Sequence, residues 1–174
     1  ENFVDSSNDF TDLVKFGFGT ALITKNLAEK IKVYREGGIE PYFGGTLFEM
    51  FAIRNNIDDY KRLVDKYGIE TVEVSDGSMR IDPDEKIEYI LDLAKSKRVL
   101  SEVGTKVAGL IIPNEVWVKN MKAELEAGAW KVIAEARESG TIGIYNSDGS
   151  ANKALIEDIM KEISVNDVLW EAPI

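Results

Sequence analysis

The chain has 174 residues, 44% of them hydrophobic, and a formal net charge of −10 at pH 7. This length predicts a single domain over residues 1–174, with enough apolar residues to bury a core. The acidic balance disfavours binding to nucleic acid or anionic membranes, and no segment has the pattern of a membrane span or a signal peptide, so a cytoplasmic protein is expected.

The chain contains neither cysteine nor histidine. Disulfides, thiolate nucleophiles, zinc sites built on these residues and Ser-His-Asp triads are therefore excluded within this sequence. Acid–base chemistry must instead use carboxylates, lysine or tyrosine, and a bound metal should be a hard ion held by oxygen atoms.

Strand-like apolar runs alternate with helical segments along the chain. Asp82 followed by Pro83 indicates a helix start, and Asn114 is predicted to cap another helix. The alternation, with strands about 25–35 residues apart, indicates parallel βαβ units. The expected strands cover 13–20, 39–43, 69–75, 99–103 and 168–172, together with a run that begins at Trp130 and breaks at Ser139 and Gly140. The expected helices cover 27–35, 58–67, 83–95, 115–126 and 152–162, and a further helix starts at 47–51.

Four of these strands carry a glutamate, although glutamate is depleted in strands. In the strand from 130, alternation places Val132 and Ala134 on one face and Glu135 with Arg137 on the other. A single strand glutamate is usually solvated or paired in a salt bridge, but four on different strands point to a shared function. They are Glu73, Glu102, Glu135 and Glu171.

Parallel βαβ units fit either a doubly wound open sheet or a (β/α)₈ barrel. Helices on both faces of an open sheet would bury the four glutamates without partners. The inward face of a barrel converges at the carboxyl-terminal mouth, where active sites of this fold lie. We therefore expect an α/β fold of the (β/α)₈ TIM-type barrel. Such a barrel typically needs about 250 residues, and six strands are expected here, so its first and last strands should be missing from this chain.

Inside a barrel these glutamates would form a mixed-charge cup together with Lys15 and Arg137. Close carboxylates repel one another unless a divalent cation or a lysine neutralises them, and Mg²⁺ suits an all-oxygen site. A metal and cationic groups around a small anionic substrate can stabilise an enolate. Lys106, in a loop at the mouth, could then deliver or remove a proton, although most loop lysines are simply solvated.

Two segments could bind an anionic group of a substrate. Arg137, followed by Ser139 and Gly140, offers a guanidinium, a hydroxyl and backbone N–H groups, which suit a phosphate or carboxylate. Gly44 and Gly45 precede a helix and form a second, weaker anion cradle, although such a pair is more often only a turn.

Six motifs at the strand ends run in order across almost the whole chain. They are Lys15 to Thr20, Phe43 to Glu49, Val72 to Ser78, Ser101 to Lys106, Glu135 to Gly140 and Trp170 to Pro173. In this order they resemble the strand-end motifs of the phosphosulfolactate synthase family. The resemblance implies a (β/α)₈ barrel that forms homotrimers and adds sulfite to phosphoenolpyruvate in a Mg²⁺-dependent Michael-type step. The product, (2R)-phospho-3-sulfolactate, leads to coenzyme M in some lineages and to sulfolactate in others.

The resemblance also implies roles for single residues. Lys106 matches the lysine proposed as general acid, which protonates C2 after sulfite attacks C3, and Glu102 and Arg137 are the other expected catalytic residues. Resemblance and geometry together assign Mg²⁺ to Glu73, Glu102 and Glu135. They assign substrate binding to Lys15, Gly44, Gly45, Arg137, Ser139 and Gly140.

Two other functions remain open at this point. One is a barrel lyase or aldolase that acts on another small phosphorylated acid, and substrate tests with and without sulfite would distinguish it. The other is a non-catalytic, stress-associated relative with the same fold, which would not bind phosphoenolpyruvate.

Overall fold

The computed structural model describes residues 2–104, 112–137 and 139–173. The chain divides into two compact units, residues 1–73 and 74–174. Each unit combines parallel strands with helices, so the predicted α/β class is confirmed. The assignment of residues 1–174 to a single domain stays a prediction.

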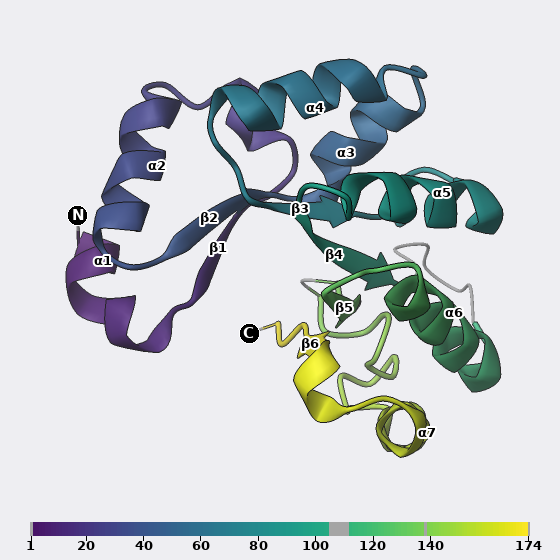
Figure 1. Cartoon of the computed structure of the whole chain (residues 1–174). Coiled ribbons are helices and arrows are strands. Elements are labelled where there is room, and N and C mark those ends of the chain that lie inside the picture. Colours follow the sequence, from purple (N-terminus) through teal and green to yellow (C-terminus); the bar gives the residue numbers. More distant parts are fainter. Residues whose placement is uncertain (1, 105–111, 138, 174) are drawn as a thin grey trace. The chain divides into compact units, whose positions relative to one another are not determined.

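The first unit alternates strands and helices. β1 pairs with β2 in parallel, from Leu13 opposite Glu40 to Phe16 opposite Phe43, and the two strands lie side by side in Figure 1. β2 pairs in parallel with β3 through Phe43. The elements are α1 (Asn2–Ser7), η1 (Asn8–Phe10), β1 (Leu13–Phe16), η2 (Thr20–Leu22), α2 (Leu27–Glu36), β2 (Glu40–Phe43), α3 (Gly45–Ala52), α4 (Ile57–Lys66) and β3 (Thr71–Val74).

Aromatic rings fill the core of the first unit. Phe43, Phe48 and Tyr60 are fully buried. The rings of Phe48 and Tyr60 meet edge to face at 5.7 Å between centroids, which joins α3 to α4. Full burial of each such side chain contributes roughly 1.5–3 kcal/mol to folding, so this core holds α3 and α4 together.

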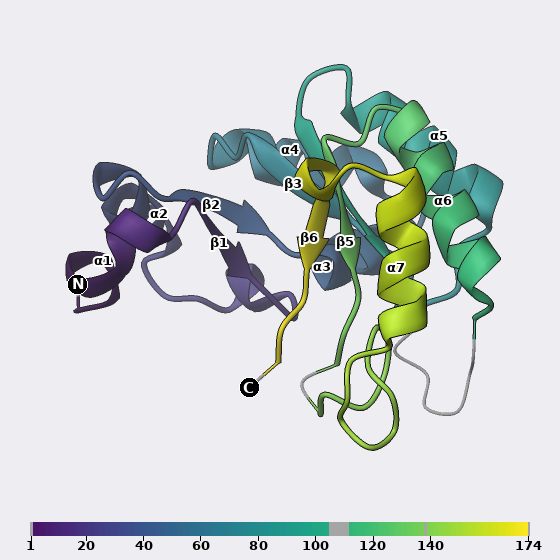
Figure 2. The ribbon, with the colours of Figure 1, turned by 90° about the horizontal axis from the view of Figure 1, so that it is seen from below.

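The second unit has the same alternation. β4 pairs with β5 and β5 pairs with β6, both in parallel, and Figure 2 shows β5 and β6 side by side with α7 along them. The elements are α5 (Pro83–Leu93), β4 (Arg98–Val103), α6 (Asn114–Glu126), β5 (Lys131–Ala134), α7 (Lys153–Glu162), η3 (Val165–Asp167) and β6 (Val168–Trp170).

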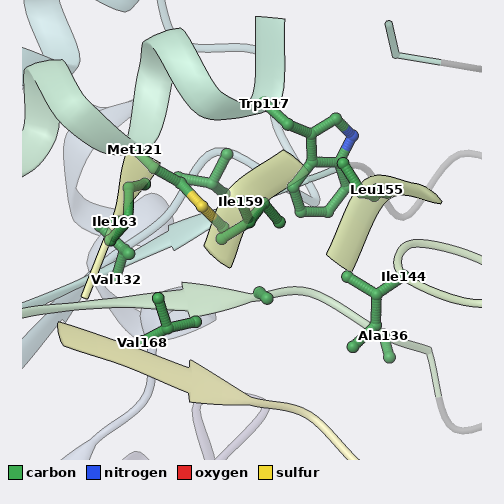
Figure 3. Packing of buried hydrophobic residues seen from close by; sticks show 11 residues of the cluster. Trp117, Met121, Val132, Ala136, Ile144, Leu155, Ile159, Ile163 and Val168 are labelled. Atoms are coloured by element: carbon green, nitrogen blue, oxygen red, sulfur yellow. The ribbon is translucent and has the colours of Figure 1, made fainter. Parts of the chain in front are cut away.

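One face of β5 packs against the helices of the second unit. Val132 and Ala134 belong to a buried cluster with Met121 of α6 and Ile159 of α7, and Figure 3 shows Met121, Ile159 and Val132 together in this cluster. This packing confirms the predicted alternation along β5. Side chains at the intervening positions of β5 therefore project from the opposite face.

The two predicted helix starts have different outcomes. The Asp82 side chain accepts a hydrogen bond from the Asp84 N–H, with Pro83 at the first helical position, so that start is confirmed. The cap at Asn114 is wrong, because Pro113 occupies the N-cap position of α6. Asn114 instead donates from Nδ2 to Asp158 of α7 at 2.9 Å.

Candidate active site

Three glutamates lie at the carboxyl ends of β4, β5 and β6. Glu102 pairs opposite Ile133 of β5, which in turn pairs opposite Leu169 of β6. Glu135 and Glu171 each lie two residues beyond these partners. Because side chains alternate along a strand, all three glutamates project from the face opposite the helix-packed one.

The three side chains converge closely. Carboxylate oxygens of Glu102, Glu135 and Glu171 lie within 4.8 Å of one another. Glu102 and Glu135 are only 3% and 2% exposed, which rejects the alternative that they are solvated surface residues. Glu171 is partly exposed, and its Oε2 accepts a hydrogen bond from the Ala136 N–H at 2.8 Å. Such a set of oxygens is suited to a hard divalent cation.

Two glycines allow other parts of the chain to approach Glu135 closely. A Cβ at Gly104 would lie 2.5 Å from the Glu135 Cβ, and one at Gly143 would lie 1.9 Å from the Glu135 carbonyl oxygen. That carbonyl also accepts a hydrogen bond from the Ile144 N–H at 3.0 Å. Residues 143 and 144 therefore pack directly against the backbone that carries the carboxylate.

In the first unit, Lys15 and Glu73 form a salt bridge of 3.0 Å between Nζ and Oε2. The other oxygen of Glu73, Oε1, accepts a hydrogen bond from the Gly45 N–H at 2.7 Å. Gly45 is the first residue of α3, where unpaired N–H groups and the helix dipole favour a negative charge. The Glu73 carboxylate thus occupies one N–H of the anion cradle that is predicted at Gly44 and Gly45 for a substrate.

Gly44 is needed for packing rather than for backbone conformation. Its φ of −70° is open to any residue. A Cβ there would however lie 3.0 Å from Cδ of Lys15 and 3.3 Å from Cα of Gly17. The glycine therefore leaves room for the Lys15 side chain on its way to Glu73. Substrate binding by Lys15, Gly44 and Gly45 stays a prediction.

The carboxylate set differs from the predicted metal ligands in one residue. Glu73 is engaged by Lys15 and Gly45, whereas Glu171 joins Glu102 and Glu135. Sequence reasoning placed Glu171 among the strand glutamates but not among the ligands. The signal in the sequence is its place at the carboxyl end of a strand-like run, the same place that Glu102 and Glu135 have in theirs. A metal role for Glu73 stays a prediction.

The remaining predicted residues follow Glu135 along the chain. Arg137 is exposed, and its carbonyl accepts a hydrogen bond from the Gly140 N–H at 2.8 Å, with Gly140 at φ 63°. The Ser139 hydroxyl lies 2.9 Å from the Thr141 hydroxyl. Lys106 lies outside the described residues.

Tyr60 in the first unit has a buried hydroxyl with no hydrogen-bond partner in the described part of the chain. Burial raises the pKa of Tyr60, and the negative charge of Glu73 raises it further. Tyr60→Phe should raise the free energy of unfolding at neutral pH by about 1 kcal/mol, because an unsatisfied buried hydroxyl is removed. Urea unfolding followed by circular dichroism would measure this change.

The same raised pKa predicts a pH dependence. Above pH of about 10, tyrosine ionises in the unfolded chain while Tyr60 stays neutral in the folded one, so the wild type loses stability as pH rises. Tyr60→Phe should lose less stability over the same rise in pH. Tyr67→Phe, which changes a partly exposed tyrosine, is the control. Identical losses of stability in wild type and Tyr60→Phe would contradict the prediction.

A family model for (2R)-phospho-3-sulfolactate synthase (ComA) matches residues 1–174. The chain belongs to the phosphosulfolactate synthase family. Three curated phosphosulfolactate synthases also match it. The Bacillus subtilis protein is 41% identical over 98% of this chain and 69% of its own length. Those of Methanothermobacter thermautotrophicus and Methanocaldococcus jannaschii are 35% and 37% identical, each over 99% of this chain and over 69% and 71% of their own lengths.

Membership in the phosphosulfolactate synthase family confirms the resemblance drawn from the six strand-end motifs and makes the chain a lyase-type enzyme. It favours the synthase over the two other functions left open by the sequence. Among the described residues, no helix is both long and apolar enough to cross a membrane.

Proposed function

We propose that this protein adds sulfite to phosphoenolpyruvate to give (2R)-phospho-3-sulfolactate, with Mg²⁺ held by Glu102, Glu135 and Glu171. The observation that carries the proposal is the convergence of these three carboxylates in a chain that belongs to the synthase family. Three carboxylates without histidine or cysteine form a hard-oxygen donor set, which fits Mg²⁺ and leaves coordination positions for water and substrate.

When bound, Mg²⁺ would supply positive charge that offsets repulsion between the two anionic substrates and polarises the carboxylate of phosphoenolpyruvate. The side chains that follow β5 would bind the substrate. Arg137 offers a guanidinium suited to a phosphate or carboxylate group, and Ser139 and Gly140 add a hydroxyl and a backbone N–H. Lys106 is the proposed proton donor, on the strength of the family resemblance.

The reaction balances without a further reactant. The sulfur lone pair of sulfite forms the new C3–S bond, and the C2–C3 π pair moves toward C2. Lys106 then gives a proton to C2, while the phosphate stays on its oxygen. The role of the protein is to hold two anions together and to place one proton donor beside C2.

We also propose that the strand–helix units belong to a (β/α)₈ barrel that assembles as a trimer. The parallel pairing of strands that are neighbours in sequence supports the barrel, because successive βα units of this fold pair in chain order. The trimer is supported by the family resemblance alone.

Incubation of the chain with phosphoenolpyruvate, sulfite and Mg²⁺, followed by ³¹P NMR, tests the proposed reaction. A new phosphomonoester signal should appear, should require sulfite, should vanish on addition of EDTA and should return with excess Mg²⁺. Turnover of phosphoenolpyruvate without sulfite would instead indicate a lyase for another phosphorylated acid. Product formation that survives chelation would contradict the metal site.

A further inference from the structure

Lys86 of α5 carries an ammonium group inside the second unit. The residue is only 4% exposed, and its Nζ lies 2.9 Å from Oδ1 of Asp76 and 2.9 Å from Oε1 of Glu124. The same nitrogen donates to the main-chain carbonyl of Glu102 at 2.6 Å. One side chain therefore connects the loop after β3, helix α6 and the end of β4.

The charges of this cluster balance one another in part. Burial lowers the pKa of Lys86, but the carboxylates of Glu124 and Asp76 more than offset that effect, and the pKa lies above its ordinary value. Burial raises the pKa of Glu124, although Lys86 opposes the shift. Lys86 is consequently charged at neutral pH, with three oxygen acceptors around its three N–H bonds.

The bond to the Glu102 carbonyl links this cluster to the carboxylates of the candidate active site. Ser101 pairs opposite Val132 on the helix-packed face, whereas the Glu102 side chain projects from the other face. Lys86 thus fixes the main chain of β4 from the helix side, at the residue whose carboxylate meets Glu135 and Glu171. A buried ion pair adds little net stability compared with apolar packing.

We propose that Lys86 is a positioning residue, whose bond to the Glu102 carbonyl holds the Glu102 carboxylate in the metal-binding arrangement with Glu135 and Glu171. This inference rests on the proposed function. Outer contacts that orient metal ligands typically change metal affinity by about 10–100-fold when removed.

Mn²⁺ binding to the metal-free chain, followed by electron paramagnetic resonance, tests this role without any turnover. Mn²⁺ prefers the same oxygen ligands as Mg²⁺. Lys86→Met keeps a long side chain but removes the ammonium, and should raise the Kd for Mn²⁺ about 10–100-fold. Lys122→Met is the matched control, because Lys122 forms a 2.9 Å pair with Glu162 on the exposed surface. Its Kd should equal that of the wild type.

A triple variant, Lys86→Met with Asp76→Asn and Glu124→Gln, separates positioning from folding. It removes the two carboxylate charges that Lys86→Met leaves without their ammonium partner, so its melting temperature should recover toward the wild-type value. Its Mn²⁺ affinity should stay weak, because the bond to the Glu102 carbonyl is still absent. If Lys86→Met alone fails to fold, the Mn²⁺ affinity of the folded triple variant tests the positioning role in its place.

Wild-type Mn²⁺ affinity in Lys86→Met, or in the folded triple variant, would overturn the positioning role and leave the proposed function intact. An absence of Mn²⁺ binding by the wild-type chain would overturn the proposed metal site and this inference with it. The two failures are therefore distinguishable.

Discussion

Glu135→Gln is expected to weaken Mg²⁺ binding by at least about 100-fold and to lower the rate of product formation by a similar factor, since even indirect contacts to a metal ligand are worth about 10–100-fold. Glutamine preserves the shape of the side chain but removes its negative charge and one acceptor oxygen. The residue is 2% exposed and lies with Glu102 and Glu171 in the carboxylate cluster. Water can therefore replace the lost oxygen only poorly.

Metal-induced stabilisation provides a measurement that does not depend on catalysis. At free Mg²⁺ of 100 times the wild-type Kd, binding stabilises the folded chain by about 2.7 kcal/mol, and a 100-fold weaker site would retain only about 0.4 kcal/mol. Glu157 is an exposed residue of α7, and Glu157→Gln makes the same change in net charge. This control variant should keep the full stabilisation by Mg²⁺. If Mg²⁺ stabilised Glu135→Gln as much as the wild type, Glu135 would not be a metal ligand.

The carboxylate cluster was largely predictable, because it follows from strand alternation. Alternation predicts that the strand glutamates share one face near the carboxyl ends of parallel strands, and Glu102 and Glu135 are buried close together on such a face. Glu73 shows the limit of this reasoning. Its contacts with Lys15 and with the first N–H of α3 depend on how that helix meets the strand, which no periodic pattern encodes.

The element order was also predictable, whereas local backbone conformation set the boundaries. The strand expected over 13–20 ends at Phe16. Phe18 and Gly19 have φ of 50° and 66°, and a left-handed conformation cannot continue a strand. The apolar composition of this segment favours a longer strand, but the left-handed residues form a turn that ends the strand.

The buried ion cluster was missed, although the helical pattern contained a signal for it. Lys86 precedes the buried Ile90 and Leu93 by four and seven residues, the spacing of one helical face. Glu124 likewise follows Trp117 and Met121 on the buried face of α6. A lysine and a glutamate at core positions of successive helices indicate a buried pair, because either charge alone would be costly to bury.

Gly143→Ala is expected to destabilise the fold strongly. Gly143 has φ of 81°, and a Cβ there would lie 1.9 Å from the carbonyl oxygen of Glu135 and 3.1 Å from Cα of Ala136. The left-handed conformation costs alanine about 1–2 kcal/mol, and forcing backbone apart adds about 1–3 kcal/mol. Because the clash falls on the Glu135 carbonyl, Mg²⁺ binding should weaken as well.

Gly149→Ala separates the strain of a left-handed alanine from the clash with the Glu135 backbone. Gly149 has φ of 83°, nearly the same conformation, but its Cβ would meet only the Gly140 carbonyl oxygen at 3.8 Å, an ordinary contact. Urea unfolding should therefore show a loss of about 1–2 kcal/mol for Gly149→Ala and about 2–5 kcal/mol for Gly143→Ala. Mg²⁺ affinity should fall only in Gly143→Ala. Equal losses of stability with unchanged Mg²⁺ affinity would mean that the backbone at Glu135 yields freely, and that residues 143 and 144 do not hold its carboxylate in place.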